Sequence, residues 1–138
     1  IHTSTFVGHP VGCAMASKAI QLYDEEGLEG ITPLERSAKL GSDLVQRLCK
    51  IKEEDSGFGD VRGKGLLVGL EFVKDPGNKE PDPKRAKTIV QSCLERGLII
   101  LSSGVHGNVI SLSPSFTIES EAYEKGLDIL TNAIAESR

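Results

Sequence analysis

The sequence of 138 residues has no tryptophan, a single methionine and only three cysteines. Cys13, Cys49 and Cys93 are widely spaced and odd in number, which is not the pattern of a disulfide framework, so we expect three reduced thiols. The cysteines and the three histidines form no close-spaced ligand pair of the C-x2-C kind that zinc sites use. The sequence therefore predicts neither a disulfide nor a metal site.

Long apolar runs and clusters of positive charge are also missing. The longest apolar run, residues 98–101, is far below the roughly 20 residues that a membrane-spanning helix needs, and no apolar leader opens the chain. With a net charge of −4 and no Lys/Arg-rich run, neither nucleic acid nor a membrane is an expected partner. These absences predict a soluble, cytoplasmic protein.

What the sequence does have is the composition of one globular domain. Apolar residues make up 38% and charged residues 26%, with 15 glycines and 6 prolines, which is typical of a folded chain with many turns. A chain of this length can bury a sizeable core. Because the first residue is Ile1 and the only methionine is Met15, inside a helical pattern, we expect a fragment of a longer protein.

Apolar spacing predicts four helices, the first from Pro10 to a C-cap at Gly27 and the others over residues 33–51, 82–96 and 120–134. The second helix is opened by a Thr32/Glu35 capping box. Alternation over residues 66–73 predicts a half-buried strand, preceded by a very short strand at residues 59–62. Two further strands, residues 98–101 and 109–113, flank a turn-rich loop, and residues 75–82 are expected to form a surface loop. This order predicts an α/β fold of the α+β type, in which helices cover a small mixed or mainly antiparallel sheet.

Three small hydroxyl residues, Thr3, Ser4 and Thr5, stand just before the first predicted helix, which begins at Pro10. They have two interpretations. The hydroxyls could accept hydrogen bonds from backbone amides ahead of the helix, which is the commonest role of Ser and Thr there. They could instead help to bind an anion, since hydroxyls and free amides near a helix start suit a phosphate. The residues alone favour the first interpretation.

Other polar motifs predict structural roles. Gly63-Lys64-Gly65 matches neither common phosphate-binding glycine pattern and is interpreted as a tight turn. Arg62 is interpreted as a salt-bridge partner. The acidic run at residues 53–55 is interpreted as a solvated helix end.

Several short motifs nevertheless follow one another in a specific order. They are HTSTF at 2–6, GHP at 8–10, EEGL at 25–28, GDVRGKGL at 59–66, GLE at 69–71, ERGL at 95–98, GNVI at 107–110, Pro114, and TI at 117–118. In this order the whole chain resembles the C-terminal portion of class III pyridoxal-phosphate-dependent aminotransferases, of the 4-aminobutyrate and ornithine aminotransferase type. The resemblance implies part of a fold type I enzyme. Residues 1–27 would form the end of its large domain with an interdomain helix, and residues 28–138 its small C-terminal α/β domain.

The resemblance also implies a role for the hydroxyl cluster. In that family a Ser-Thr pair at the position of Ser4 and Thr5 reaches the cofactor phosphate of the neighbouring subunit, which implies pyridoxal 5'-phosphate as cofactor and a homodimer as assembly. The lysine that bonds covalently to the cofactor would lie in the missing N-terminal large domain. We therefore expect no catalytic residue in these 138 residues and no activity of the fragment alone. The parent protein would transfer an amino group between an amine or ω-amino acid and a keto acid.

Two residues depart from the family pattern. Ser111 stands where the family usually has an arginine that grips a substrate carboxylate, and a neutral hydroxyl cannot supply that charge-assisted grip. His9 stands where asparagine is common. Two alternatives stay open: an independent α/β binding or oligomerisation module without a cofactor, and a parent that epimerises or isomerises amino compounds on the same scaffold.

Overall fold

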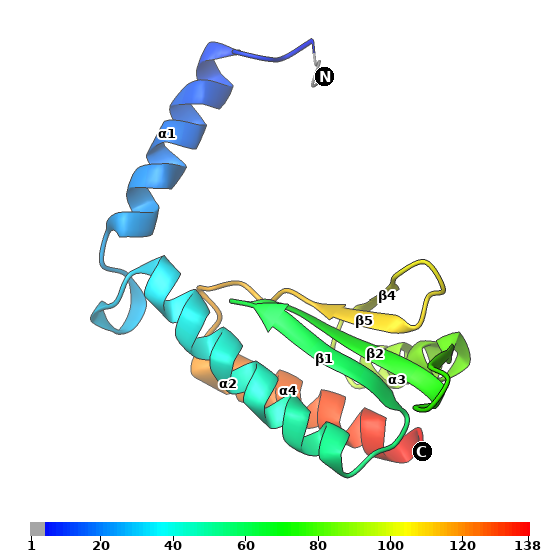
Figure 1. Cartoon of the computed structure of the whole chain (residues 1–138). Helices are drawn as coiled ribbons and strands as arrows, with labels where there is room; N and C mark the ends of the chain where they lie inside the picture. The colour runs from blue at the N-terminus through cyan, green and yellow to red at the C-terminus, as the bar shows by residue number, and fades with distance from the viewer. Residues whose placement is uncertain (1–4) are drawn as a thin grey trace. The chain divides into compact units, whose positions relative to one another are not determined.

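The computed structural model describes residues 5–138, apart from the side chain of Leu28, and is drawn in Figure 1. From the N-terminus the elements are α1 (Pro10–Asp24), η1 (Leu28–Gly30), α2 (Pro33–Glu53), β1 (Phe58–Lys64), β2 (Leu67–Asp75), β3 (Glu80–Pro81), α3 (Pro83–Glu95), β4 (Leu101–Ser103), β5 (Val109–Leu112) and α4 (Ser120–Glu136). The chain divides into two compact units, Ile1–Arg36 and Ser37–Arg138. The predicted domain boundary between residues 27 and 28 stays a prediction.

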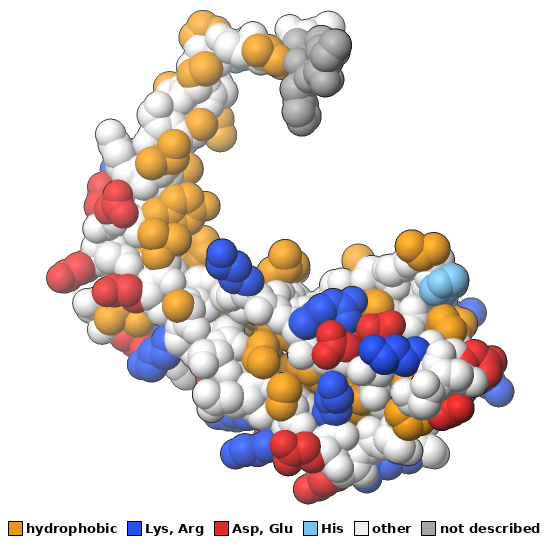
Figure 2. Space-filling view, in the orientation of Figure 1, with side chains coloured by type: hydrophobic (Ala, Val, Ile, Leu, Met, Phe, Trp, Pro, Cys, Tyr) orange, Lys and Arg blue, Asp and Glu red, His pale blue; other side chains and the backbone are white. Residues whose placement is uncertain are grey.

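The first unit holds α1, the short 3-10 helix η1 and the first turn of α2. Pro10 occupies the first helical position of α1, where its missing N–H costs no hydrogen bond. Gly27 was expected to end this helix, but α1 ends at Asp24 with an extended Glu25 as C-cap. Every residue of α1 is exposed, and Figure 2 shows apolar side chains along it.

The capping box at the start of α2 is confirmed. The Glu35 amide donates to Thr32 Oγ1 at 3.2 Å, and Glu35 Oε2 accepts from the Thr32 amide at 2.9 Å. This reciprocal pair satisfies two backbone donors that would otherwise lack partners at a helix start.

The second unit is built on an antiparallel sheet with the strand order β1-β2-β5-β4, and β3 pairs with β2 beside this path. β2 confirms the alternating strand, and the β4–β5 hairpin is confirmed with a register that pairs Leu101 with Ser111. Three boundaries differ from the sequence prediction. β1 is seven residues long, the expected loop after β2 contains β3, and β4 begins only at Leu101. Residues 98–100 lie outside the ladder, a difference that an apolar run cannot reveal.

The core fills the space between one face of this sheet and helices α2, α3 and α4 (Figure 1). Alternate residues of the central strands point into it and are almost fully buried, among them Val68, Leu70, Phe72 and Ile110. The helices contribute the residues that the apolar spacing predicted. These are Leu44 and Leu48 from α2, Ala86, Ile89 and Cys93 from α3, and Tyr123, Leu127, Leu130 and Ile134 from α4. The α/β fold of the α+β type, with helices covering a small sheet, is therefore confirmed.

A close backbone contact joins α2 to the β1–β2 turn. Gly65 lies in this turn with φ of +54°, a left-handed conformation that favours glycine. The tight turn predicted at residues 63–65 is therefore present but begins only at Gly65, because Gly63 and Lys64 still pair with β2. A Cβ added to Gly41 of α2 would lie 2.0 Å from the carbonyl oxygen of Gly65. Gly41 is therefore required where the helix touches the turn.

The prediction of a solvated acidic run was wrong for Asp55. Its side chain is only 5% exposed and forms an ion pair with Arg85 of α3, which is itself 10% exposed. Asp55 Oδ1 accepts from Arg85 Nη1 at 2.9 Å and from the Gly57 amide at 3.0 Å, and Oδ2 accepts from Arg85 Nη2 at 2.5 Å. Arg138 donates from Nε to the same carboxylate at 3.2 Å. The partner lies 30 residues along the chain, so a local charge pattern could not show it.

Candidate functional site

The N-terminal hydroxyl cluster lies only partly within the described residues. Thr5 is exposed and opens a turn that spans residues 5–8, in which the His9 amide donates to the Phe6 carbonyl at 3.1 Å. Gly8 closes the turn with φ of +74°. This turn directs the chain into α1 at Pro10. Ser4, the other candidate cofactor-binding residue, lies outside the described residues.

The start of α1 gives a first indication of what these hydroxyls could bind. His9 is the N-cap of α1, and among the described residues no side chain caps this helix. The amides of the first helical turn carry a partial positive charge and suit an anion. Capping by the Thr5 hydroxyl, the interpretation that the residues alone favoured, is thus not seen in the described part of the chain. Hydroxyl and helix start together have the chemistry of a phosphate site.

The lysine side chains of the chain are exposed or half-buried. All ten lysines fall within the described residues 5–138, and none of them is buried. At Lys74, the hydrogen bond to Glu80 raises the pKa of the amine. A nucleophilic lysine needs the reverse, a pKa lowered by burial or by a neighbouring cation.

Arg62 has the structural role that the sequence predicted. It lies on β1 and donates from Nη1 to Asp60 at 3.1 Å and to Glu71 of β2 at 3.0 Å. The hydrogen bond to Asp60, together with that to Glu71, raises the pKa of the Arg62 guanidinium. With two carboxylates already on this cation, the geometry favours an ion-pair network over a site for a substrate carboxylate.

Ser111, the other departure from the family pattern, lies on β5 and pairs in register with Gly69 of β2 and Leu101 of β4. Its neighbours Ile110 and Leu112 are buried, so by strand alternation its side chain belongs to the face of the sheet that the helices do not cover. The Ser111 and Ser103 hydroxyl oxygens lie 2.6 Å apart. The site therefore offers a neutral hydroxyl pair.

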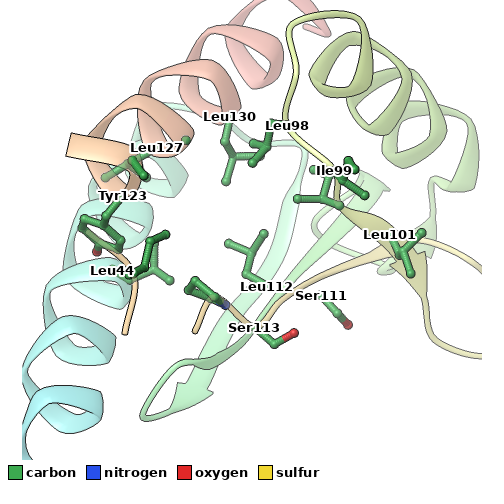
Figure 3. A pocket seen from close by; sticks show the side chains of 15 residues that line it. Leu44, Leu98, Ile99, Leu101, Ser111, Leu112, Ser113, Tyr123, Leu127 and Leu130 are labelled. Atoms are coloured by element: carbon green, nitrogen blue, oxygen red, sulfur yellow. The ribbon is translucent and has the colours of Figure 1, made fainter. Parts of the chain in front are cut away.

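An apolar cavity of about 440 Å³ lies beside Ser111, at the end of the sheet (Figure 3). Leucines from α2, α4, β5 and the segment before β4 surround it, including Leu44, Leu98, Leu112, Leu127 and Leu130. This cavity was not predicted from the sequence. The signal was present in the apolar residues 98–101, which were assigned to a strand although most of them line the cavity outside the ladder.

Two features are absent from the described residues 5–138. No helix there is both long enough and apolar enough to cross a bilayer. No group of three or more His, Cys, Asp or Glu side chains is placed to hold a metal ion.

Comparison with known proteins gives a family for almost the entire chain. The family model for "Aminotransferase class-III" matches residues 1–134. The leucine/methionine racemase of Thermococcus litoralis is 42% identical over 135 residues, which is 98% of this chain and 29% of that protein. The 4-aminobutyrate aminotransferase of Mycobacterium leprae is 36% identical over 132 residues, which is 96% of this chain and 28% of that protein.

Solved structures show the same similarity in three dimensions. A Bacillus anthracis aminotransferase superposes with a TM-score of 0.79 and 36% identity, covering 98% of this chain and 30% of that one. A PLP-bound aminotransferase mutant from Vibrio fluvialis superposes with a TM-score of 0.71 and 30% identity, covering 94% and 27%. The chain thus spans less than a third of the length of the proteins that it matches.

Proposed function

The chain belongs to the class III aminotransferase family, and on that premise we propose that it is the C-terminal part of a pyridoxal-phosphate-dependent enzyme, the parent protein. The match over residues 1–134, combined with coverage of only 29% of the racemase and 28% of the 4-aminobutyrate aminotransferase, carries this proposal. The parent protein transfers an amino group between an amine or ω-amino acid and a keto acid. It acts as a homodimer, and the part that lies outside these 138 residues forms its large domain.

Within this enzyme, residues 1–27 complete the phosphate site. The Thr5 hydroxyl, with Ser4 beside it, donates a hydrogen bond to the cofactor phosphate held by the neighbouring subunit. A β-branched threonine keeps its hydroxyl in few rotamers, which suits a group that must hold an anchor in place. The described residues fit this role, because Thr5 is exposed and the α1 start has no side-chain cap.

The covalent chemistry belongs elsewhere in the parent protein. When bound, pyridoxal phosphate supplies an electron sink for the amino compound attached to its aldehyde carbon. The lysines of this chain, none of which is buried, are poor candidates for the amine that holds it. We therefore expect the 138-residue chain alone to be inactive.

Substitution of Thr5 in the parent protein tests this function. Thr5→Ala should raise the Kd for pyridoxal phosphate about tenfold or more, the effect of losing a hydrogen bond to a charged group, whereas Thr5→Ser should largely retain affinity. Thr88→Ala is the matched control, because the Thr88 hydroxyl of α3 bonds only locally, to the Lys84 carbonyl at 3.1 Å. Titration of cofactor absorbance measures all three. Equal affinity of Thr5→Ala and wild type would contradict the assignment of Thr5.

A second function, racemisation or epimerisation of an amino acid, is favoured by the 42% identity to the leucine/methionine racemase. Ser111 is compatible with it, because the neutral hydroxyl pair of Ser111 and Ser103 provides no positive charge to bind a second carboxylate on the substrate. One assay distinguishes the two functions. A transaminase needs a keto acid to complete its cycle, whereas a racemase inverts an L-amino acid such as leucine without one. Chiral analysis of products with and without keto acid decides between them.

A further inference from the structure

The apolar cavity at the end of the sheet opens onto a larger exposed apolar surface. At its rim, Ile99 is 80% exposed and Leu101 is 70% exposed, although both belong to an apolar run. Among the described residues that line the cavity, none carries a charge. Contiguous apolar surface of this kind is uncommon on a finished protein surface and marks a place where another group binds. We call the cavity with Ile99 and Leu101 the β4 groove.

Two of the three hydroxyls that line the β4 groove, those of Tyr123 and Ser111, are already engaged, which argues against a small polar ligand. The Tyr123 hydroxyl donates to Asp43 Oδ2 at 3.0 Å, and the Ser111 hydroxyl shares a 2.6 Å hydrogen bond with Ser103. Small-molecule sites normally place a few polar groups toward the ligand to orient it. A groove that offers so few of them suits apolar side chains of a polypeptide.

The surroundings of the groove favour an occupant that brings no charge of its own. Beside the groove, Arg47 of α2 donates to Glu124 of α4 at 2.7 and 3.0 Å and to Asp43 at 3.1 Å, so the charges nearest to it are already held in ion pairs with one another. In the described sheet, β4 pairs only with β5, and its outer edge is open. An uncharged, apolar lining and an open strand edge together form an interface for a polypeptide segment.

We propose that the β4 groove is covered, in the parent protein, by apolar side chains of the polypeptide that precedes Ile1. This inference rests on the proposed function, in which the chain is the C-terminal part of a longer enzyme. The length available is ample, because the chain covers only 28–29% of the racemase and 4-aminobutyrate aminotransferase relatives that it matches over nearly its whole length. Ile99 and Leu101 are then interior residues of the parent protein, although they lie on the surface of the 138-residue chain.

Charge substitution at Leu101 tests this proposal in the full-length parent protein. Leu101→Asp should lower the melting temperature by about 4 °C or more, because a carboxylate would be forced into an apolar interface. The matched control is Leu94→Asp, since Leu94 of α3 is 52% exposed and does not line the cavity. The control should shift the melting temperature by less than about 1 °C. Equal shifts for the two variants would overturn the proposal.

Hydrogen exchange provides a second measurement that does not depend on a variant folding. In the wild-type parent protein the amides of residues 98–103 should exchange at least about tenfold more slowly than in the 138-residue chain. Equal rates would overturn the proposal, and slowing that disappears on dilution would overturn it in favour of a second copy as the occupant. Bound pyridoxal phosphate in the same parent sample shows whether the proposed function holds, so the two failures are distinguishable.

Discussion

Helices α1 and α4 have similar apolar spacing but opposite surroundings. In α4 the predicted stripe is realised, and Tyr123, Leu127 and Ile134 are buried against the sheet and its other helices. In α1 the corresponding residues stay on the surface, with Met15 68% and Ile20 65% exposed. Apolar periodicity therefore states which surface a segment can bury, whereas burial also requires that the partner belong to the same folded unit.

The glycines of the two units show the same difference in surroundings. Gly41 of α2 has a backbone neighbour where its Cβ would be, whereas a Cβ on Gly12 of α1 would meet nothing within 4 Å. Small residues on a helix predict a close approach, and only in the second unit is the approaching chain present.

The largest expected effect comes from the core of the second unit. Phe72→Ala should lower the free energy of unfolding by about 3–5 kcal/mol, because it leaves a cavity in a fully buried site. Met15→Ala in α1 should change it by less than about 0.5 kcal/mol, since Met15 is largely exposed. Urea unfolding of the 138-residue chain measures both. A large cost for Met15→Ala would break the contrast between the two helices.

The buried ion pair comes next. Asp55→Ala should cost about 3 kcal/mol, because it leaves the guanidinium of Arg85 nearly buried without its carboxylate. Its control is Glu80→Ala, which removes an exposed pair with Lys74 and should leave the denaturant midpoint almost unchanged. Denaturant midpoints at neutral pH compare them. Equal costs would show that burial does not distinguish these two pairs.

The two glycines predict effects of opposite sign. Gly41→Ala should destabilise the chain by about 1–3 kcal/mol, because its Cβ would collide with the Gly65 carbonyl. Gly12→Ala should make α1 more favourable by about 0.5–1 kcal/mol through helix propensity alone. Helix content from circular dichroism and thermal unfolding report the two changes. A stabilising Gly41→Ala would contradict the close contact.

The smallest expected effect is a loss of folding stability at low pH. Burial alone would raise the pKa of Asp55, but the hydrogen bonds from Arg85 and the Gly57 amide, with the charges of Arg85 and Arg138, hold it below the usual value. An unfolded Asp titrates near about 3.9, so below that pH the unfolded state binds more protons and stability is lost. Wild type should therefore lose stability between about pH 4 and the lower folded pKa, and Asp55→Asn should lose less. If wild type and Asp55→Asn lost the same stability as the pH falls, the result would contradict this assignment.

Much of the fold could be predicted from the sequence, because its signals are local. The Thr32/Glu35 box, the alternation in β2 and the α4 stripe each depend on residues a few positions apart, and all three are confirmed. The features that sequence analysis missed depend on distant partners. The Asp55–Arg85 pair joins residues 30 positions apart, and the β4 groove needs α2, α4 and β5 together. The role of Thr5 stays a prediction, since it depends on groups beyond these 138 residues.

The site of covalent attachment of the cofactor tests the account most directly. The parent protein, loaded with pyridoxal phosphate, is reduced with borohydride to fix the cofactor on its lysine, then digested and analysed by mass spectrometry. We predict one labelled lysine outside residues 1–138 and no specific label on the ten lysines within them. Stoichiometric label on one of those ten lysines would contradict the assignment of this chain to the non-covalent part of the site.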